Sequence, residues 1–207
     1  MGPLATDLDA VIAGRTVPSV FLETVAARPD AVALRWRPDG GDTATAGLTW
    51  AEYAERAARV AAGLRELGVR PGQRVLLMMR NRPEFHYADM GVLLTGATPI
   101  SIYNSSAPEQ VQYLAGHSEA SAAIVGDVGM LERFLKVRSE LPDLQKLVLM
   151  DDPDGLAPSD VVPFADLLGA APVRAMRHPS SPTSVRMVAK AALSTCSQAA
   201  ASSGGRG

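Results

Sequence analysis

The strongest constraint on the fold is a regular alternation of short apolar runs and helical patterns through the middle of the chain. The first run is apolar without alternation, which is typical of a parallel strand buried on both faces. Four predicted strands follow one another, and a helical segment separates each pair: Val75–Met79, Thr98–Ile102, Ala122–Val125 and Leu147–Met150. This order predicts βαβ units, a parallel sheet and right-handed crossovers.

The helices between these runs have start and stop signals. Asn81–Glu84 places a proline in a first turn, and Gly96 ends that helix. Ser106 and Glu109 have the spacing of a capping box, which predicts a second helix as far as Gly116. Two further helices are expected at Met130–Arg138 and Pro163–Leu168.

The N-terminal part predicts a helix, a strand and a hairpin loop. The helix is expected over Pro18–Arg28, and the strand over Ala31–Arg37. Alternation places Val32, Leu34 and Trp36 on one side of this strand. Four glycines or prolines in Pro38–Gly47 then predict an exposed hairpin loop.

The next helix carries the clearest local pattern. Thr49 and Glu52 form a capping box, and Leu48 with Tyr53 has the spacing of a hydrophobic staple. Gly68 marks the end of the helix. The residues with helical spacing that form its apolar stripe are Tyr53, Ala57, Val60, Ala61, Leu64 and Leu67.

Ligands of parallel sheets bind beyond the carboxyl ends of the strands. Two segments occupy such positions here, Arg80–Arg82 and Tyr103–Ser106. Asn81, Tyr103 and Asn104 are therefore candidate ligand-binding residues. The alternatives are a helix cap at Asn81 and a surface turn at the other two.

Composition narrows the class of protein. The single cysteine, Cys196, excludes a disulfide framework and favours a cytoplasmic location. The N-terminus has acidic residues where a signal peptide needs basic ones, and apolar runs of about five residues allow at most peripheral membrane contact. His86, His117 and His178 lack the spacing of metal ligands, so we assign no metal site and no catalytic residue.

The chain changes character near Val173. Residues 1–172 hold 15 basic and 22 acidic residues, a formal charge of −7, whereas residues 173–207 hold five basic residues and no acid. Five charges over that length are too sparse to predict nucleic-acid binding. The segment also lacks apolar periodicity, so it is interpreted as a frameshifted coding end or as a natural disordered tail. We therefore expect an extension (1–17), an incomplete α/β part (18–172) and this tail.

Four segments, in this order, resemble the N-terminal part of the AMP-forming adenylating enzymes, the acyl-CoA synthetase superfamily. The last of them is most similar to the long-chain fatty acid–CoA ligase branch. The segments are Leu48–Tyr53 with the helix that ends in Gly68-Val-Arg-Pro-Gly-Gln-Arg-Val-Leu-Leu, then Asn81-Arg-Pro-Glu-Phe, Gly91–Ile102, and Tyr103-Asn-Ser-Ser-Ala-Pro-Glu-Gln-Val-Gln-Tyr-Leu.

The resemblance implies the first part of the N-terminal domain of such a ligase. The intact family converts a fatty acid and ATP with Mg²⁺ into an acyl-adenylate, and then transfers the acyl group to coenzyme A. Its Ser/Thr/Gly-rich phosphate loop ends in Pro-Lys. None of the three lysines here, Lys136, Lys146 and Lys190, follows a glycine-rich turn. We therefore expect an inactive fragment that needs no cofactor of its own.

Two alternatives remain beside the inactive fragment. The chain could be one half of a split ligase, completed by a second polypeptide that carries the phosphate loop and the C-terminal domain. It could also be a non-enzymatic binding module, although no glycine-rich strand-to-helix fingerprint supports nucleotide binding.

Overall fold

The structure is a computed structural model that describes residues 13–38 and 45–170. The predictions for residues 1–12, for most of the hairpin loop and for the tail, with His178, Lys190 and Cys196, lie outside the described residues. No helix in the described part is both long and apolar enough to cross a membrane.

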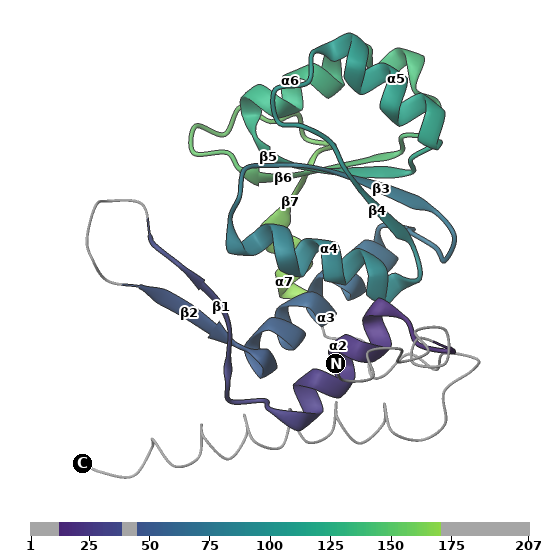
Figure 1. Cartoon of the computed structure of the whole chain (residues 1–207). Helices are drawn as coiled ribbons and strands as arrows, with labels where there is room; N and C mark the ends of the chain where they lie inside the picture. Colours follow the sequence, from purple (N-terminus) through teal and green to yellow (C-terminus); the bar gives the residue numbers. More distant parts are fainter. Residues whose placement is uncertain (1–12, 39–44, 171–207) are drawn as a thin grey trace, which may run out of the picture.

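A five-stranded parallel sheet forms the centre of the molecule (Figure 1). In space the strands follow the order β4-β3-β5-β6-β7, and every neighbouring pair is parallel. In chain order the strands are β3 (Arg74–Met78), β4 (Thr98–Ser101), β5 (Ala122–Asp127), β6 (Lys146–Asp151) and β7 (Val162–Pro163). This confirms the predicted α/β class and the parallel sheet. It adds β7, which has only two residues, one of them a proline suited to a sheet edge.

Helices cover both faces of this sheet (Figure 1). One layer contains α2 (Val17–Ala27), α3 (Trp50–Glu66), α4 (Pro83–Thr95) and α7 (Phe164–Gly169), and the other contains α5 (Pro108–Ser118) and α6 (Val128–Val137). A short 3₁₀ turn, η1 (Arg138–Glu140), follows α6. The result is a three-layer arrangement with a core on each side of the sheet.

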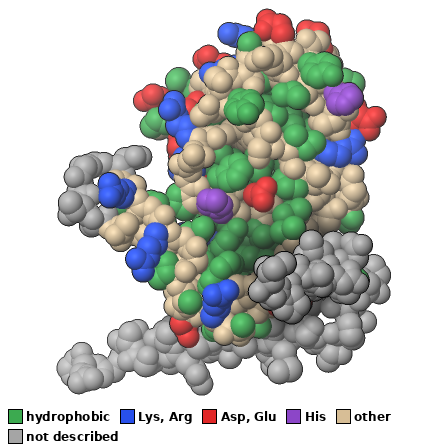
Figure 2. Space-filling model, viewed as in Figure 1, with side chains coloured by type: hydrophobic (Ala, Val, Ile, Leu, Met, Phe, Trp, Pro, Cys, Tyr) green, Lys and Arg blue, Asp and Glu red, His purple; other side chains and the backbone are tan. Residues whose placement is uncertain are grey.

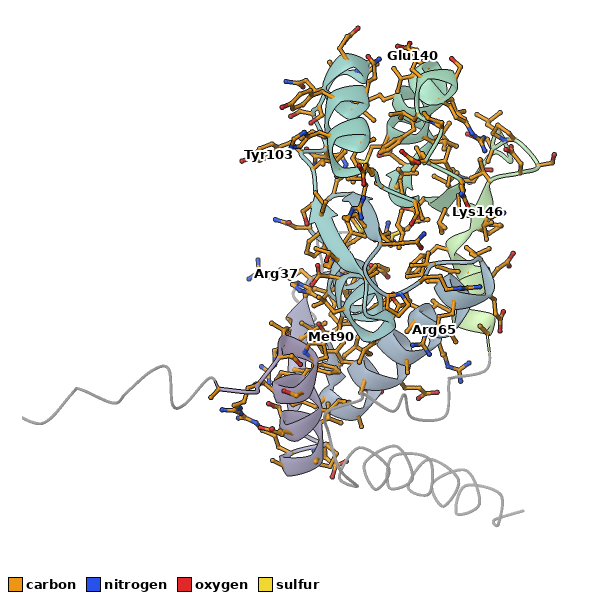
Figure 3. The ribbon with its side chains drawn as sticks, turned by 90° about the vertical axis from the view of Figure 1, so that its right-hand side faces the viewer. Arg37, Arg65, Met90, Tyr103, Glu140 and Lys146 are labelled. Atoms are coloured by element: carbon orange, nitrogen blue, oxygen red, sulfur yellow. The ribbon has the colours of Figure 1, made fainter. Side chains whose placement is uncertain are left out.

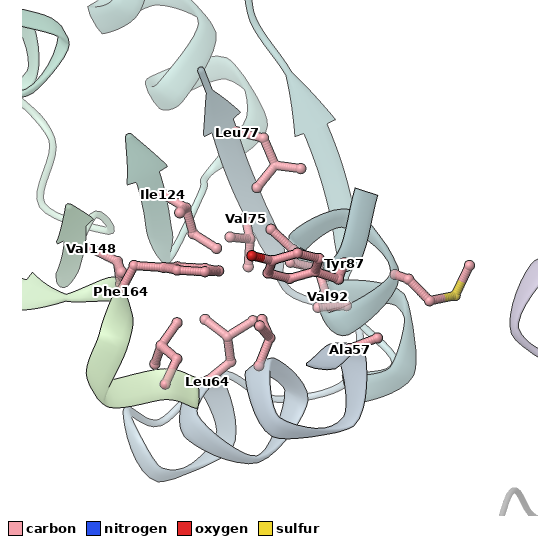
Figure 4. Close-up of a cluster of buried hydrophobic side chains, with 14 of the residues drawn as sticks. Ala57, Leu64, Val75, Leu77, Tyr87, Val92, Ile124, Val148 and Phe164 are labelled. Atoms are coloured by element: carbon pink, nitrogen blue, oxygen red, sulfur yellow. The ribbon is translucent and has the colours of Figure 1, made fainter. Parts of the chain in front are cut away.

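The larger core lies between the sheet and the layer that contains α3 and α4 (Figure 4). Strands β3, β5 and β6 contribute alternate residues to it because successive side chains point to opposite faces. Val75 and Leu77 of β3 face this core, whereas Leu76 and Met78 face the core beneath α5 and α6. The continuous apolar run at β3 thus reflects burial on both faces.

Helix α3 begins as the sequence predicts. The Thr49 hydroxyl accepts a hydrogen bond from the backbone N–H of Glu52 at 3.2 Å, and a Glu52 carboxylate oxygen accepts one from the Thr49 N–H at 2.8 Å. Gly68 adopts a left-handed conformation with φ +100° just after the helix. The predicted stripe faces the core, with Leu67 at its end partly buried.

The predicted proline in the first turn of α4 is confirmed, but the caps expected at Asn81 and Ser106 are wrong. Arg82, not Asn81, is the N-cap residue of α4, and it makes no side-chain capping bond. At α5 the cap is Ala107 rather than Ser106; the Gln110 side chain accepts a hydrogen bond from the Ala107 N–H at 2.9 Å. In both cases a proline fixes the first helical residue, and its position decides where the helix starts.

The N-terminal strand pairs antiparallel with a second strand to form a separate two-stranded hairpin, β1 (Val32–Trp36) and β2 (Ala46–Thr49). Val32, Leu34 and Trp36 were expected on one side of this strand; Leu34 and Trp36 pack on the larger core, whereas Val32 is 48% exposed. The pairing register shifts between Val32 and Leu34. The change in side-chain environment along β1 coincides with this shift in the pairing register.

Candidate functional site

The sheet order reverses direction at β3, whose neighbours are β4 on one side and β5 on the other. The carboxyl edge beside such a point is where ligands bind in doubly wound folds. The loop after β3 holds Arg80 and Asn81, both exposed. The backbone N–H of Ile102 donates to Leu77 O at 3.0 Å, so the loop that begins at Tyr103 leaves the same edge. The structure thus brings the two predicted segments to neighbouring positions.

Tyr103 and Asn104 form a surface turn that helix α6 holds in place. Tyr103 is 84% exposed and points outward (Figure 3). The Arg133 guanidinium of α6 donates to the backbone oxygens of Asn104 at 2.6 Å and of Ser106 at 3.0 Å. These bonds fix the backbone and leave the Tyr103 ring available to another molecule.

A shallow hollow lies between this turn and α5. Its floor and walls come from Tyr103, Ser106, Glu109, Gln110, Tyr113 and Leu114. Tyr113 is 66% exposed and stacks on His117, with the ring centroids 5.6 Å apart. The two tyrosines make this the more aromatic end of the carboxyl edge.

Arg82 ties three elements together at the other end of this edge. Its Nε donates to Glu84 Oε2 at 2.8 Å, and its Nη1 donates to Asp151 Oδ2 at the end of β6. Burial lowers the pKa of Arg82, but the hydrogen bonds and charges of Asp151 and Glu84 outweigh burial and raise it. Arg82 is therefore a permanent cation, already neutralised by two carboxylates.

The same network continues into the core layer. Burial raises the pKa of Glu84, but its hydrogen bond and charge interaction with Arg82 prevail and lower it, so Glu84 is ionised at neutral pH. Burial and then the charge of Glu84 raise the pKa of Tyr87. The Arg56 guanidinium lies 5.8 Å from the centre of the Tyr87 ring. These contacts link α3, α4 and β6.

Two further carboxylates at the edge have structural roles. Asp127, at the end of β5, accepts a hydrogen bond from the Met130 N–H at 2.8 Å and caps α6. Asp152 accepts from the N–H groups of Leu156 at 2.8 Å and Ala157 at 3.0 Å. Both carboxylates thus accept hydrogen bonds from backbone N–H groups.

At this edge the described residues include the exposed Arg80 and the ion-paired Arg82, but no lysine. In residues 13–38 and 45–170 no group of three or more His, Cys, Asp or Glu side chains is placed to hold a metal ion. Lys136 lies in α6 and Lys146 in β6, away from any glycine-rich turn. The sequence interpretation missed Asp151 and Arg133. Asp151 follows a strand end, a signal that could have found it, whereas nothing local marks Arg133.

The sequence matches the family model of the AMP-binding enzymes over residues 21–187, most of the chain. The chain belongs to the AMP-binding enzyme family. Its fold corresponds to the N-terminal part of solved adenylating enzymes, as the resemblance implied.

Curated relatives match the chain at moderate identity. The chain is 44% identical over 109 residues to the uncharacterized protein Rv1549 of Mycobacterium tuberculosis, covering 53% of this chain and 59% of that protein. It is 29% identical over 140 residues to the long-chain-fatty-acid–CoA ligase heimdall of Drosophila melanogaster, covering 67% and 21%. It is 31% identical over 176 residues to a salicyl-AMP ligase of M. tuberculosis, covering 83% and 30%.

A solved structure, that of MbtA, shares the fold over most of this chain. The apo structure of MbtA from Mycobacterium smegmatis superposes with a TM-score of 0.64 and 28% identity, covering 83% of this chain and 31% of that one. The matched part of the chain thus spans between a fifth and a third of the length of the two ligases and of MbtA. It spans 59% of the length of Rv1549.

Proposed function

We propose that the chain supplies the N-terminal part of an AMP-forming fatty acid–CoA ligase and works in the cytoplasm. The reaction joins the fatty acid carboxylate to the α-phosphate of ATP, releasing pyrophosphate, and coenzyme A then displaces AMP. The observation that carries this proposal is the family match together with long-chain fatty-acid ligases among the relatives. ATP, Mg²⁺ and coenzyme A are the cofactors that such a ligase would use.

We further propose that the chain is inactive alone and that a second polypeptide completes it. Preorganised positive charge at the phosphates is a large share of catalysis in this kind of chemistry. At the carboxyl edge Arg82 is paired with Glu84 and Asp151, so in the described residues Arg80 is the remaining exposed arginine of this loop. The second polypeptide would carry the phosphate loop.

The direct test is fatty-acid-dependent exchange of labelled pyrophosphate into ATP, with palmitate as substrate. The chain alone should give no exchange above the buffer blank. Exchange should appear when a polypeptide with the phosphate loop is added. Clear exchange by the chain alone would contradict the proposed inactivity. Pyrophosphate exchange by the completed enzyme at the same rate with and without palmitate would contradict the ligase assignment.

A second candidate substrate class is an aryl acid, since the salicyl-AMP ligase matches over 83% of this chain. The same exchange assay with salicylate in place of palmitate separates the two classes. A non-enzymatic nucleotide-binding role makes a different prediction: ATP alone should then raise the melting temperature of the isolated chain in proportion to its occupancy.

A further inference from the structure

The hollow between the Tyr103 turn and α5 is aromatic and acidic. Tyr103 is 84% exposed and Tyr113 66% exposed, and both line the hollow. Among the side chains that line it, Glu109 carries the charge, and it is exposed. In Figure 2 hydrophobic side chains, a class that includes tyrosine, are exposed beside a histidine over α5. The hollow therefore offers aromatic rings and a carboxylate to a partner.

The fold sets the position of both tyrosines without burying them. The Tyr113 ring stacks on His117 with an angle of 6° between the ring planes. Arg133 fixes the backbone on both sides of the Tyr103 turn through the carbonyl oxygens of Asn104 and Ser106. Groups that are positioned in advance lose little conformational freedom when a partner binds, so the hollow is prepared for contact.

The C-terminal part of the sequence contains a segment that suits such a hollow. Residues 177–182 read Arg-His-Pro-Ser-Ser-Pro, which is the pattern P-x-x-P with an arginine two residues before its first proline. This pattern favours the polyproline II helix, which has three residues per turn and a rise of about 3.1 Å per residue. In that conformation Pro179 and Pro182 lie on one edge, about 9 Å apart. Grooves lined by aromatic side chains bind segments of this kind.

The charges of the two surfaces are complementary. Residues 1–172 hold 15 basic and 22 acidic residues, whereas residues 173–207 hold five basic residues and no acid. Locally, Arg177 precedes the first proline and Glu109 lines the hollow. Opposite charges of this kind orient two partners and raise the rate at which they associate.

The geometry favours a segment from a second copy over the chain's own segment. Helix α7, where the described chain ends, packs on the larger core, whereas α5 packs on the core of the opposite face of the sheet. The nine residues from 171 to 179 span at most about 32 Å when fully extended. A sheet with a helix layer on each face is about 30 Å thick, which leaves almost no length for a path around its edge.

We propose that the hollow of one chain binds residues 177–182 of a second copy. The two prolines lie against Tyr103 and Tyr113, and Arg177 faces Glu109. The tyrosine hydroxyls can donate to the carbonyl groups of the segment, because a polyproline II helix makes no internal hydrogen bonds. This contact goes beyond the proposed ligase function and needs neither ATP nor an acyl substrate.

The first test titrates a fluorescent peptide of residues 173–186 into the full chain and follows its anisotropy. The receptor carries Pro179→Ala and Pro182→Ala, so that its own segment does not compete. We expect saturable binding that Tyr113→Ala in the receptor weakens by about tenfold or more. The matched control is Leu156→Ala, at a residue that is 64% exposed and does not line the hollow, and it should leave the affinity unchanged. Absence of binding, or equal losses in the two receptors, would overturn the proposal.

Variants of the peptide give a comparison that does not depend on how the receptor variants fold. Replacing both prolines by alanine should weaken binding by about tenfold or more. The matched control replaces the two intervening residues, Ser180→Ala and Ser181→Ala, and should bind like the original peptide. Equal binding by the proline variant would show that the P-x-x-P pattern is not recognised.

A double-mutant cycle tests the charge pair. The peptide variant Arg177→Gln and the receptor variant Glu109→Gln should each weaken binding, and the double variant should lose less than the sum because both changes remove the same contact. Fully additive losses would overturn the placement of Arg177.

Sedimentation equilibrium of the full chain tests whether the occupant comes from a second copy. The wild-type chain should associate as its concentration rises, and the variant with Pro179→Ala and Pro182→Ala should associate about tenfold more weakly or not at all. Equal association of the two proteins would overturn the proposal. A wild-type chain that stays monomeric while the receptor binds the peptide would overturn the assignment to a second copy.

Discussion

A Cβ atom on Gly91 of α4 would lie 2.6 Å from Cγ1 of Val60 on α3. The two helices touch at this point, and only a residue without a side chain fits. Gly63 has the same role against α7, where a Cβ would meet Cα of Leu167 at 2.7 Å. The helix layer that covers the larger core is therefore built on two close approaches.

Gly91→Ala should destabilise the chain by about 1–3 kcal/mol, because the new methyl group must displace Val60 or the helix backbone. Urea unfolding followed by circular dichroism measures this change. The matched control is Gly116→Ala in α5, where the new Cβ would meet only Leu141 Cδ2 at 3.8 Å. That variant should gain stability, by up to about 1 kcal/mol, from helix propensity. Equal losses in both variants would contradict the close approach.

Thr49→Ala should lower the free energy of unfolding by about 1 kcal/mol, because the Glu52 N–H loses its acceptor at the start of α3. Thr49→Ser retains the hydroxyl and is the control, with a loss well below that of alanine. The measurement is again urea unfolding. A Thr49→Ala variant as stable as the serine variant would show that the cap is not needed.

Arg82→Met should cost about 1 kcal/mol at pH 7, because it leaves Glu84 and Asp151 without their shared cation. The folded-state pKa of Glu84 lies below its usual value, so its contribution is present above the unfolded pKa and is lost as pH falls through the folded pKa. The difference between wild type and variant should therefore shrink below about pH 4.

The control for this variant is Arg138→Met. Among the described residues Arg138 pairs with one carboxylate, Asp160, at 2.7 Å and with an exposure similar to that of Arg82, so its loss should be smaller. Thermal melts of the three proteins from pH 3 to pH 7 give the comparison. A difference between wild type and Arg82→Met that does not change with pH would refute the role of Glu84.

Asp89→Asn should raise the melting temperature at pH 7. Burial raises the pKa of Asp89, and the charge of His86 offsets this only in part. A carboxyl with a raised folded-state pKa favours the folded state at low pH, and this contribution is lost as pH rises through that pKa. The gain from the amide should therefore vanish in acid. Asp143→Asn, at an exposed position, is the control and should change stability by less than about 0.5 kcal/mol.

The sequence located most of the strands and helices because their signals are local. The capping box of Thr49 and Glu52, the prolines at helix starts and the glycines at helix ends act within one turn, so a short stretch of chain specifies them. The apolar run at Val75–Met79 likewise predicted a strand buried on both faces. The helix caps expected at Asn81 and Ser106 were wrong, because two competing local signals lay one or two residues apart and the proline prevailed.

The sequence by itself therefore determined the class of fold and the order of its elements, because periodicity and capping depend on neighbours along the chain. It also determined the family resemblance, because that rests on the order of four sequence segments. Tertiary structure alone decided that Arg82 pairs with Asp151, 69 residues away, that Arg133 holds the turn at Asn104, and that Val32, beside a shift in the β1–β2 register, is exposed. These relationships depend on which strands become neighbours and in which register. That choice is made by packing two cores against one sheet, and no local pattern encodes it.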